Sequence, residues 1–302
     1  MKVLLFGRDG QVGWELQRAL SVLGEVVALD FDASQNPQGL CGDFTDLAGL
    51  ERTVEAVQPD VIVNAAAHTA VDKAESEPEL ARLINALAPA TLAQAAIKSG
   101  ALLVHYSTDY VFDGSGDTPW TETDTTGPLS VYGQTKLEGE QAVAACPQHL
   151  ILRTSWVYAT RCGNFAKAML RLAGERDSLT VINDQFGAPT SAELLADVTA
   201  HAICRLQTQP QLAGLYHCIA AGETTWHGYA QFVLQQAASL GLPLKATADK
   251  VAPAPTSSYP TPARRPLNSR LDTRKLQVAF GLTLPPWQHG VQRMLTEIAG
   301  ER

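Results

Sequence analysis

Residues 2–13 read KVLLFGRDGQVG, an apolar run followed by glycines at positions 7, 10 and 13. Trp14 to Leu23 then has helical periodicity, so this stretch predicts a buried strand, a tight turn and a helix. A glycine-rich turn lets the backbone approach a pyrophosphate, and the N-terminus of the helix supplies free N–H groups. The alternative is a purely structural turn.

Four further apolar runs alternate with segments that have helical periodicity. They are EVVAL (25–29), DVIVNAAA (60–67), ALLVHYS (101–107) and LILRTS (150–155). Strands that are apolar on both faces and spaced in this way predict a doubly wound α/β fold of the Rossmann type with a parallel sheet. A crossover helix is expected over 46–58, and Pro89 should begin a new segment or kink the helix expected over 78–98.

The second half of the chain is less regular. Helices are expected over 164–174, 191–206 and 228–240, and the proline-rich stretch 246–266 is expected to be a loop. We therefore expect residues 1–160 to form a dinucleotide-binding domain, to which some later segments return. Residues 161–302 should form mainly a substrate-binding lobe.

Composition excludes several classes of function. The 302 residues carry a formal charge of −8, which argues against a nucleic-acid partner. No apolar stretch reaches the length of a membrane span, and the N-terminal apolar run is too short for a secretory signal. The five cysteines include no C-x-x-C pair. A cytoplasmic protein without membrane contact is the expectation.

Residues after the second run and at the end of the third run bear on the nucleotide. Asp30 stands 23 residues after Gly7, where an acidic side chain accepts hydrogen bonds from the adenosine ribose and favours NAD over NADP. Arg8 could instead meet a 2′-phosphate, so both cofactors stay open. GDF (42–44) and NAAAH (64–68) are read either as nucleotide contacts or as a helix cap and close strand–helix packing.

A candidate catalytic set lies at the end of the fourth run and on the next helix. Ser107-Thr108-Asp109 closes ALLVHYS, and YGQTK (132–136) places Tyr132 and Lys136 on one helix face. A phenol titrates near pH 10, so we expect the Lys136 ammonium to favour the phenolate and Tyr132 to act as a general acid toward an alkoxide. Thr108 would polarise the carbonyl. Y-x-x-x-K alone arises often by chance, but its combination with the glycine-rich turn is specific.

Seven segments together carry a resemblance to the dTDP-4-dehydrorhamnose reductases, a family of extended short-chain dehydrogenases/reductases. They are GRDGQVGWEL, NAAAHTAVDKAE, HYSTDYVFDG, VYGQTKLEGE, RTSWVY, NDQFGAPT and YPTPARRPLNSRL. The resemblance implies that NADPH or NADH reduces the 4-keto group of dTDP-4-dehydro-L-rhamnose to give dTDP-L-rhamnose, the last step in making this donor for cell-surface polysaccharide.

The same resemblance assigns residues. The implied catalytic trio is Thr108, Tyr132 and Lys136. The cofactor set, with the turn glycines, is Gly7, Gly10, Gln11, Val12, Gly13, Asp30, Asp43, Phe44, Ala67, His68, Thr69, Tyr106, Tyr132 and Lys136. The substrate set is Thr108, Asp109, Trp156, Arg264 and Arg265, in which the two arginines would hold the diphosphate unless they are ordinary surface residues. The resemblance also implies a homodimer with Mg²⁺ held by Glu15, Glu193 and Glu297.

Two other classes compete with a reductase. A regulatory subunit that binds NADP without turnover would have no need for the complete catalytic set. A sugar-nucleotide epimerase or dehydratase of the same superfamily would retain its NAD through the reaction. A dehydratase would need a second acidic residue directly after Asp109, where this chain has Tyr110.

Overall fold

The five apolar runs of the N-terminal half form five parallel strands in the computed structural model, which describes residues 1–300. The strands are β1 (Lys2–Phe6), β2 (Glu25–Leu29), β3 (Val61–Asn64), β4 (Leu102–Thr108) and β5 (His149–Thr154). A sixth strand, β10 (Gly214–His217), pairs in parallel with β5 and was not expected from the sequence. The strand order β10-β5-β4-β3-β1-β2 confirms the predicted doubly wound sheet.

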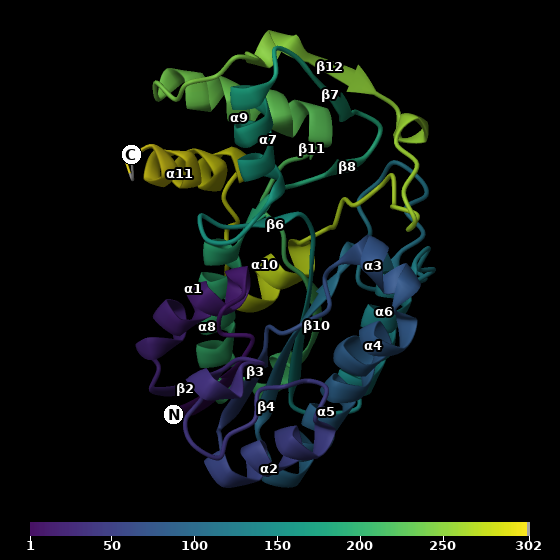
Figure 1. Ribbon diagram of the computed structural model, residues 1–302. Coiled ribbons are helices and arrows are strands. Elements are labelled where there is room, and N and C mark those ends of the chain that lie inside the picture. The colour runs from purple at the N-terminus through teal and green to yellow at the C-terminus, as the bar shows by residue number, and fades with distance from the viewer. Residues whose placement is uncertain (301–302) are drawn as a thin grey trace.

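Helices cover both faces of this sheet (Figure 1). One face carries α1 (Gln11–Ser21), α8 (Ala192–Thr208) and α10 (Arg274–Phe280). The other carries α2 (Leu47–Val57), α5 (Ala88–Ser99) and α6 (Val131–Ala144). Side chains of β1 alternate between the two cores: Val3 and Leu5 join the first, and Leu4 and Phe6 join the second. Burial on both faces explains why the strands are apolar without alternation.

The helical stretch before β4 is interrupted near Pro89, as expected. It consists of α3 (Val71–Ser76), α4 (Pro78–Arg82), the π-helical turn η2 (Leu83–Leu87) and α5, with Pro89 in the first turn of α5. Contrary to the sequence reading, Pro78–Ser99 is long and apolar enough to cross a membrane by length and composition alone. Half of its most apolar window is buried within the protein, as expected of a core helix.

A second group of elements lies above the carboxyl ends of the strands in Figure 1 and forms its own apolar core. Its helices are α7 (Phe165–Glu175), α9 (Trp226–Ser239) and α11 (Trp287–Gly300). Three two-stranded sheets join β6 (Val157–Tyr158) to β9 (Thr190–Ser191), β7 (Leu179–Ile182) to β12 (Val251–Ala254), and β8 (Phe186–Gly187) to β11 (Thr224–Thr225).

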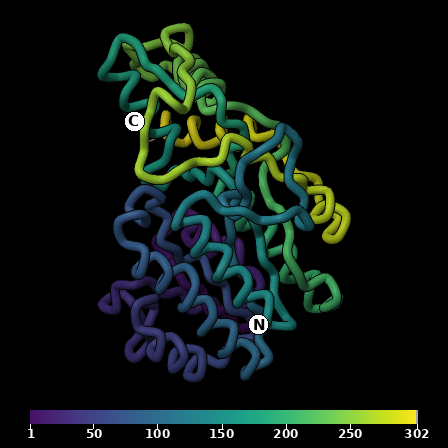
Figure 2. Tube along the Cα trace, turned by 90° about the vertical axis from the view of Figure 1, so that its right-hand side faces the viewer, coloured from purple at the N-terminus to yellow at the C-terminus, as the bar shows by residue number. Residues whose placement is uncertain are grey.

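Short 3-10 turns complete the described elements: η1 (Ala33–Gln35), η3 (Asp109–Val111), η4 (Pro210–Leu212), η5 (Ala248–Lys250) and η6 (Thr256–Ser258). The expectation of a loop over 246–266 is wrong in part, because β12 lies within it. β12 pairs with a single neighbour, a position in which Pro253 is tolerated. In Figure 2 this proline-rich segment lies with the upper group, while most of the N-terminal half lies below.

Candidate active site

A cavity of about 770 Å³ lies where the carboxyl ends of the parallel strands meet the second group of elements. Its walls include residues that follow β1, β2 and β3, the last residues of β4 and β5, and Trp156 and Trp226 from above. β2 and β3 lie on opposite sides of β1, so the strand order reverses there, and such a switch point is where ligands bind in doubly wound sheets.

Most of the residues predicted for the site meet in this cavity. Those that line it are Gly7, Gly10, Gln11, Val12, Asp30, Asp43, Phe44, Ala67, Thr69, Tyr106, Thr108, Asp109, Tyr132, Lys136 and Trp156. Gly13, His68, Arg264 and Arg265 are not part of its lining. The structure therefore assembles the nucleotide, catalytic and Trp156 candidates at one place and leaves the two arginines outside it.

The glycine-rich turn leaves no room for larger residues at two positions. Gly7 has φ +84°, and a Cβ there would lie 2.7 Å from the backbone nitrogen of Ala66. A Cβ on Gly13 would lie 1.9 Å from the Gly7 carbonyl oxygen, although Gly13 itself does not face the cavity. The glycines thus let β1, the turn and α1 pack closely, and they keep the backbone open toward the cavity.

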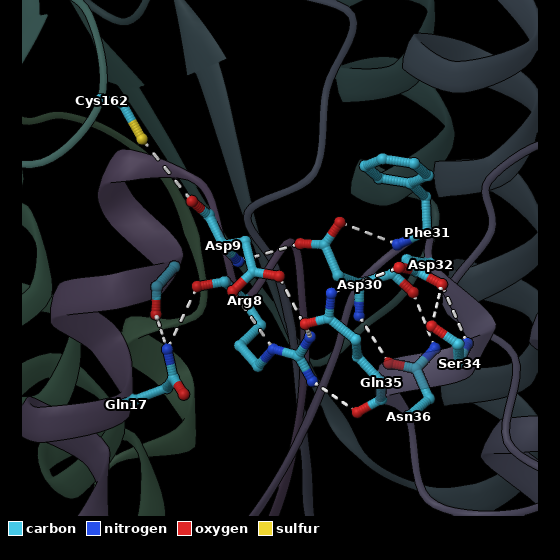
Figure 3. A network of polar contacts seen from close by, with 11 residues as sticks. Arg8, Asp9, Gln17, Asp30, Phe31, Asp32, Ser34, Gln35, Asn36 and Cys162 are labelled. Atoms are coloured by element: carbon cyan, nitrogen blue, oxygen red, sulfur yellow. Dashed lines mark hydrogen bonds and ion pairs between the residues drawn. The ribbon is translucent and has the colours of Figure 1, made fainter.

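Asp30 ties the end of β2 to this turn. Its Oδ2 accepts a hydrogen bond from the Asp9 N–H at 2.9 Å and its Oδ1 accepts one from the Phe31 N–H at 2.8 Å (Figure 3). Asn36 braces the Asp30 backbone, donating to its carbonyl oxygen at 2.7 Å and accepting from its N–H at 3.0 Å. The carboxylate is therefore fixed at the cavity wall.

The first two turns of α6 present Tyr132 and Lys136. Ser130 caps this helix by accepting from the Gly133 N–H at 3.2 Å, and Glu75 accepts from the Val131 N–H at 2.8 Å. The Lys136 Nζ donates to the Tyr106 carbonyl oxygen of β4 at 2.6 Å, and the side chain is buried. Burial lowers the pKa of Lys136 to about 8, against an opposing effect of Glu140.

The Tyr132 phenol behaves differently from the sequence expectation. Burial raises its pKa to about 12, a hydrogen bond with Thr108 lowers it, and the Asp109 carboxylate raises it. Lys136 does not favour the phenolate here, because its ammonium is directed to the Tyr106 carbonyl. The chain's own groups thus keep Tyr132 protonated at neutral pH, which is the form that a proton donor needs.

His105 belongs to β4, the strand that also contains Thr108, and its ring lies next to the Lys136 ammonium. Its Nε2 is 3.4 Å from the Lys136 Nζ, and its Nδ1 is 3.0 Å from the Asn64 Nδ2. The Asn64 Oδ1 accepts from the Ala66 N–H at 3.0 Å, which assigns its Nδ2 as the donor to His105. Burial, followed by the charge of Lys136, holds the pKa of His105 well below its usual value, so the ring is neutral.

Several buried polar atoms on the cavity wall have no partner within the described residues. They are Ser107 Oγ, Asp109 Oδ2, Thr154 Oγ1 and Ser155 Oγ, at the ends of β4 and β5. Burial raises the pKa of Asp109 to about 6 despite hydrogen bonds from Ser269 and Thr108. Unsatisfied buried groups of this kind call for a polar ligand. Together with the glycine cradle, they fit a dinucleotide and a polar co-substrate.

Trp156 is held in an aromatic slot. Its backbone is left-handed at φ +49°, which is rare for a bulky residue and typical of functional sites. Its ring stacks on Trp226 with centroids 3.7 Å apart, and a Cβ on Gly187 would lie 2.9 Å from its other edge. Trp226 in turn donates from Nε1 to the Gln185 Oε1 at 3.0 Å. The sequence reading missed Trp226, Thr154 and Ser155 as wall residues and gave Ser107 no separate role, although Ser107 and Ser155 directly flank predicted residues.

The two arginines predicted to bind diphosphate lie at the edge of the site. The Arg265 Nη2 pairs with the Asp72 Oδ2 at 2.8 Å, and the Asp72 Oδ1 accepts from the Ala263 N–H at 3.2 Å. The Arg265 Nη1 is buried without a partner within residues 1–300. Arg264 is exposed. Asp72 therefore holds Arg265 in place and leaves one of its nitrogens available.

The three glutamates predicted to hold Mg²⁺ are paired with arginines. The Arg293 Nε lies 3.1 Å from the Glu193 Oε2 and 3.4 Å from the Glu297 Oε1, and the Arg18 Nε lies 3.5 Å from the Glu15 Oε2. Among residues 1–300, no group of three or more His, Cys, Asp or Glu side chains is arranged to hold a metal ion. These carboxylates do not form a cation site within one chain.

A doubly wound sheet that brings a glycine-rich turn and a Thr-Tyr-Lys trio into one cavity defines a Rossmann-type oxidoreductase of the short-chain dehydrogenase class. Residues 1–299 match the family described as the RmlD substrate binding domain, and the chain belongs to this family.

Similar proteins agree with this assignment. The dTDP-4-dehydrorhamnose reductase of Escherichia coli (strain K12) is 59% identical over 99% of this chain and 98% of its own length. The crystal structure of a dTDP-4-dehydrorhamnose reductase from Clostridium acetobutylicum has a TM-score of 0.87 at 35% identity and covers 99% of both chains. The enzyme of the same name from Bacillus anthracis, solved with NADP, has a TM-score of 0.84 at 32% identity and covers 98% of this chain and 99% of that one.

Proposed function

We propose that this chain reduces the 4-keto group of dTDP-4-dehydro-L-rhamnose to give dTDP-L-rhamnose, with NADPH or NADH as the reductant. The observation that carries the proposal is 59% identity over 99% of the chain to a curated dTDP-4-dehydrorhamnose reductase. The cavity supports it, because the candidates for nucleotide binding and for proton transfer line the same cavity. The reaction completes dTDP-rhamnose synthesis for cell-surface polysaccharide, and we expect it in the cytoplasm.

The chain's own residues account for the proton side of this reaction. When bound, the reduced nicotinamide supplies the hydride. Thr108 would donate a hydrogen bond to the ketone oxygen and stabilise the charge that develops there. Tyr132 would then transfer its proton to that oxygen, which is favourable even with a pKa of about 12 because an alkoxide is a much stronger base than a phenolate. Lys136, which shares a helix face with Tyr132 and is held by the Tyr106 carbonyl, would hold the nicotinamide ribose.

A division of labour between the two groups of elements follows from this proposal. The elements around the parallel sheet would hold the dinucleotide through Gly7, Gly10, Asp30 and their neighbours. The upper group would hold the sugar nucleotide, with Trp156 against the sugar and Arg265 near the diphosphate. The homodimer and its Mg²⁺ site remain predictions from the family resemblance. Size-exclusion chromatography with and without Mg²⁺ tests both.

The deciding experiment measures loss of the near-ultraviolet absorbance of NADH or NADPH on mixing with dTDP-4-dehydro-L-rhamnose. Tyr132→Phe should abolish turnover. Tyr216→Phe is a matched control, because it also removes a buried phenol, one that donates to the Leu212 carbonyl on the far side of the sheet. Binding without cofactor oxidation would favour a regulatory subunit, and product formation without net oxidation would favour an epimerase or dehydratase.

A further inference from the structure

Gln185 is buried between two parts of the upper group of elements. It lies in the turn between β7 and β8, and only 4% of it is exposed. Its Oε1 accepts a hydrogen bond from the Trp226 Nε1 at 3.0 Å, and its Nε2 donates to the Thr256 Oγ1 at 3.1 Å. One side-chain amide therefore bridges the first residue of α9 and the first residue of η6.

The direction of these hydrogen bonds is set by the partners of Gln185. An indole N–H can only donate, so the amide oxygen must face Trp226. The Thr256 hydroxyl gives its single proton to the Asp184 Oδ1 at 2.6 Å, so it can only accept from Gln185. The Thr256 N–H also donates to Asp184, at 2.9 Å. A reversed amide would oppose two donors at one end and two acceptors at the other, so this side chain has one favourable orientation.

At one end of this chain of hydrogen bonds lies the aromatic pair of the cavity. Trp226 stacks on Trp156 with ring centroids 3.7 Å apart, and both residues line the cavity. Gly187, two residues after Gln185, lies against the Trp156 ring, where a Cβ would be 2.9 Å from it. The stretch of chain that contains Gln185 therefore fixes both the stacking partner of Trp156 and the space beside its ring.

At the other end begins the segment 256–267, which carries Arg265. Gln185 contacts the first residue of this segment. The next residue of the same turn, Phe186, donates from its N–H to the Leu267 carbonyl oxygen at 2.8 Å. The segment thus leaves and returns at one turn, and Arg265 lies between the two attachments.

We propose that Gln185 is a positioning residue that couples the Trp156–Trp226 pair to the segment carrying Arg265, so that a sugar nucleotide is held by both as one unit. The inference rests on the proposed function, in which Trp156 lies against the sugar and Arg265 near the diphosphate. Gln185 itself does not line the cavity and acts through its two hydrogen bonds. A ligand that orders one end of the site then orders the other as well.

The test compares two variants of Gln185 in steady-state reduction of dTDP-4-dehydro-L-rhamnose. Gln185→Met keeps the size of the side chain and loses both hydrogen bonds, so KM for the sugar nucleotide should rise about tenfold. Gln185→Glu keeps the acceptor for Trp226 but places a carboxylate oxygen beside the Thr256 Oγ1, so KM should rise at least as much. In both variants kcat and the dissociation constant of NADH should stay within about twofold.

Coupling further predicts that changes at the two ends are not independent. Trp226→Leu and Thr256→Val should each raise KM about tenfold, and the double variant should raise it little further, instead of about a hundredfold. Gln231→Met is a matched control, because it removes another glutamine of the upper group, one that donates to the Ala248 carbonyl oxygen at 3.4 Å. It should leave KM unchanged.

The outcomes separate this inference from the proposed function. An unchanged KM in Gln185→Met, or independent effects of Trp226→Leu and Thr256→Val, would overturn the inference alone. Equal losses in KM, kcat and NADH binding would also overturn it, since they indicate a general loosening of the fold. If the unmodified protein oxidises no cofactor, the proposed function fails, and calorimetric titration with dTDP-L-rhamnose tests the same variants by affinity. Absence of binding by the unmodified protein in that titration would overturn both.

Discussion

Breaking the buried ion pair between α6 and β5 should be strongly destabilising. The Arg153 Nε donates to the Glu140 Oε2 at 2.9 Å and its Nη2 to the Oε1 at 2.5 Å, with both side chains less than a tenth exposed. The guanidinium also lies 4.9 Å from the centroid of the Phe112 ring. Glu140→Gln would leave this buried cation without its counter-charge, which costs about 3–5 kcal/mol.

The expected change in melting temperature follows from the size of the chain. With an unfolding entropy of about 2.1 cal/mol/K per residue, 302 residues give about 0.6 kcal/mol per kelvin. Glu140→Gln should therefore lower Tm by about 5–8 °C, measured by circular dichroism together with urea unfolding. Activity should fall as well, because α6 carries Tyr132 and Lys136.

A matched control lies on the surface of α7. Arg171 and Glu175 form an exposed i,i+4 pair at 3.1 Å, so Glu175→Gln should change stability by less than about 0.5 kcal/mol. The double variant Arg153→Met/Glu140→Leu should recover most of the loss, since it removes the buried charge together with its partner. If Glu140→Gln and Glu175→Gln proved equally mild, the argument from burial would be refuted.

Three further variants or profiles test the site. Gly13→Ala should weaken binding of both dinucleotides and lower the free energy of unfolding by about 1–3 kcal/mol, because its Cβ would lie 1.9 Å from the Gly7 carbonyl oxygen. Gly163→Ala, with nothing within 4 Å, should be neutral in both measurements. The pH profile of kcat/KM should fall as pH rises through about 8, where Lys136 loses its charge, and a profile flat to the ordinary lysine pKa of about 10.4 would contradict this. Trp226→Leu should raise KM for the sugar nucleotide about tenfold, the size of a lost aromatic contact, without changing nucleotide affinity, and an unchanged KM would exclude its support of Trp156.

The sheet was predictable where the strands are long and apolar. The runs at 2–6 and 25–29 match β1 and β2 at both ends. β10 was not predicted because GLYH has four residues, only two of them buried, and shows no alternation of apolar and polar side chains. Its place in the sheet depends on pairing with β5. β12 was not predicted because Pro253 is a strong loop signal. The proline is tolerated in this strand because β12 pairs with only one neighbouring strand.

Within the site, residues at characteristic spacings along the chain could be predicted, whereas contacts between residues far apart in the sequence could not. Gly7, Asp30 and the Tyr132-Lys136 pair stand at spacings that their chemistry requires, so the chain itself reveals them. Trp226 reaches the cavity only because α9 folds back onto Trp156, 70 positions earlier. The sequence also suggested that Arg8 could contact a phosphate. Its hydrogen bond to the Gln35 carbonyl oxygen could not be predicted, because it depends on the conformation of the turn after β2. The raised pKa of Tyr132 arises from burial, which the spacing alone does not reveal.

The sheet is completed by residues that are synthesised late. α8 shares a core with Val3 and Leu5 of β1, and β10 covers the outer edge of β5. A nascent chain that ends near residue 160 would therefore expose apolar side chains on one sheet face and an unpaired strand edge, both of which favour aggregation. We expect the growing chain to need chaperone protection until residue 217 has emerged. We also expect that dividing the gene near residue 160 would not yield two halves that fold independently.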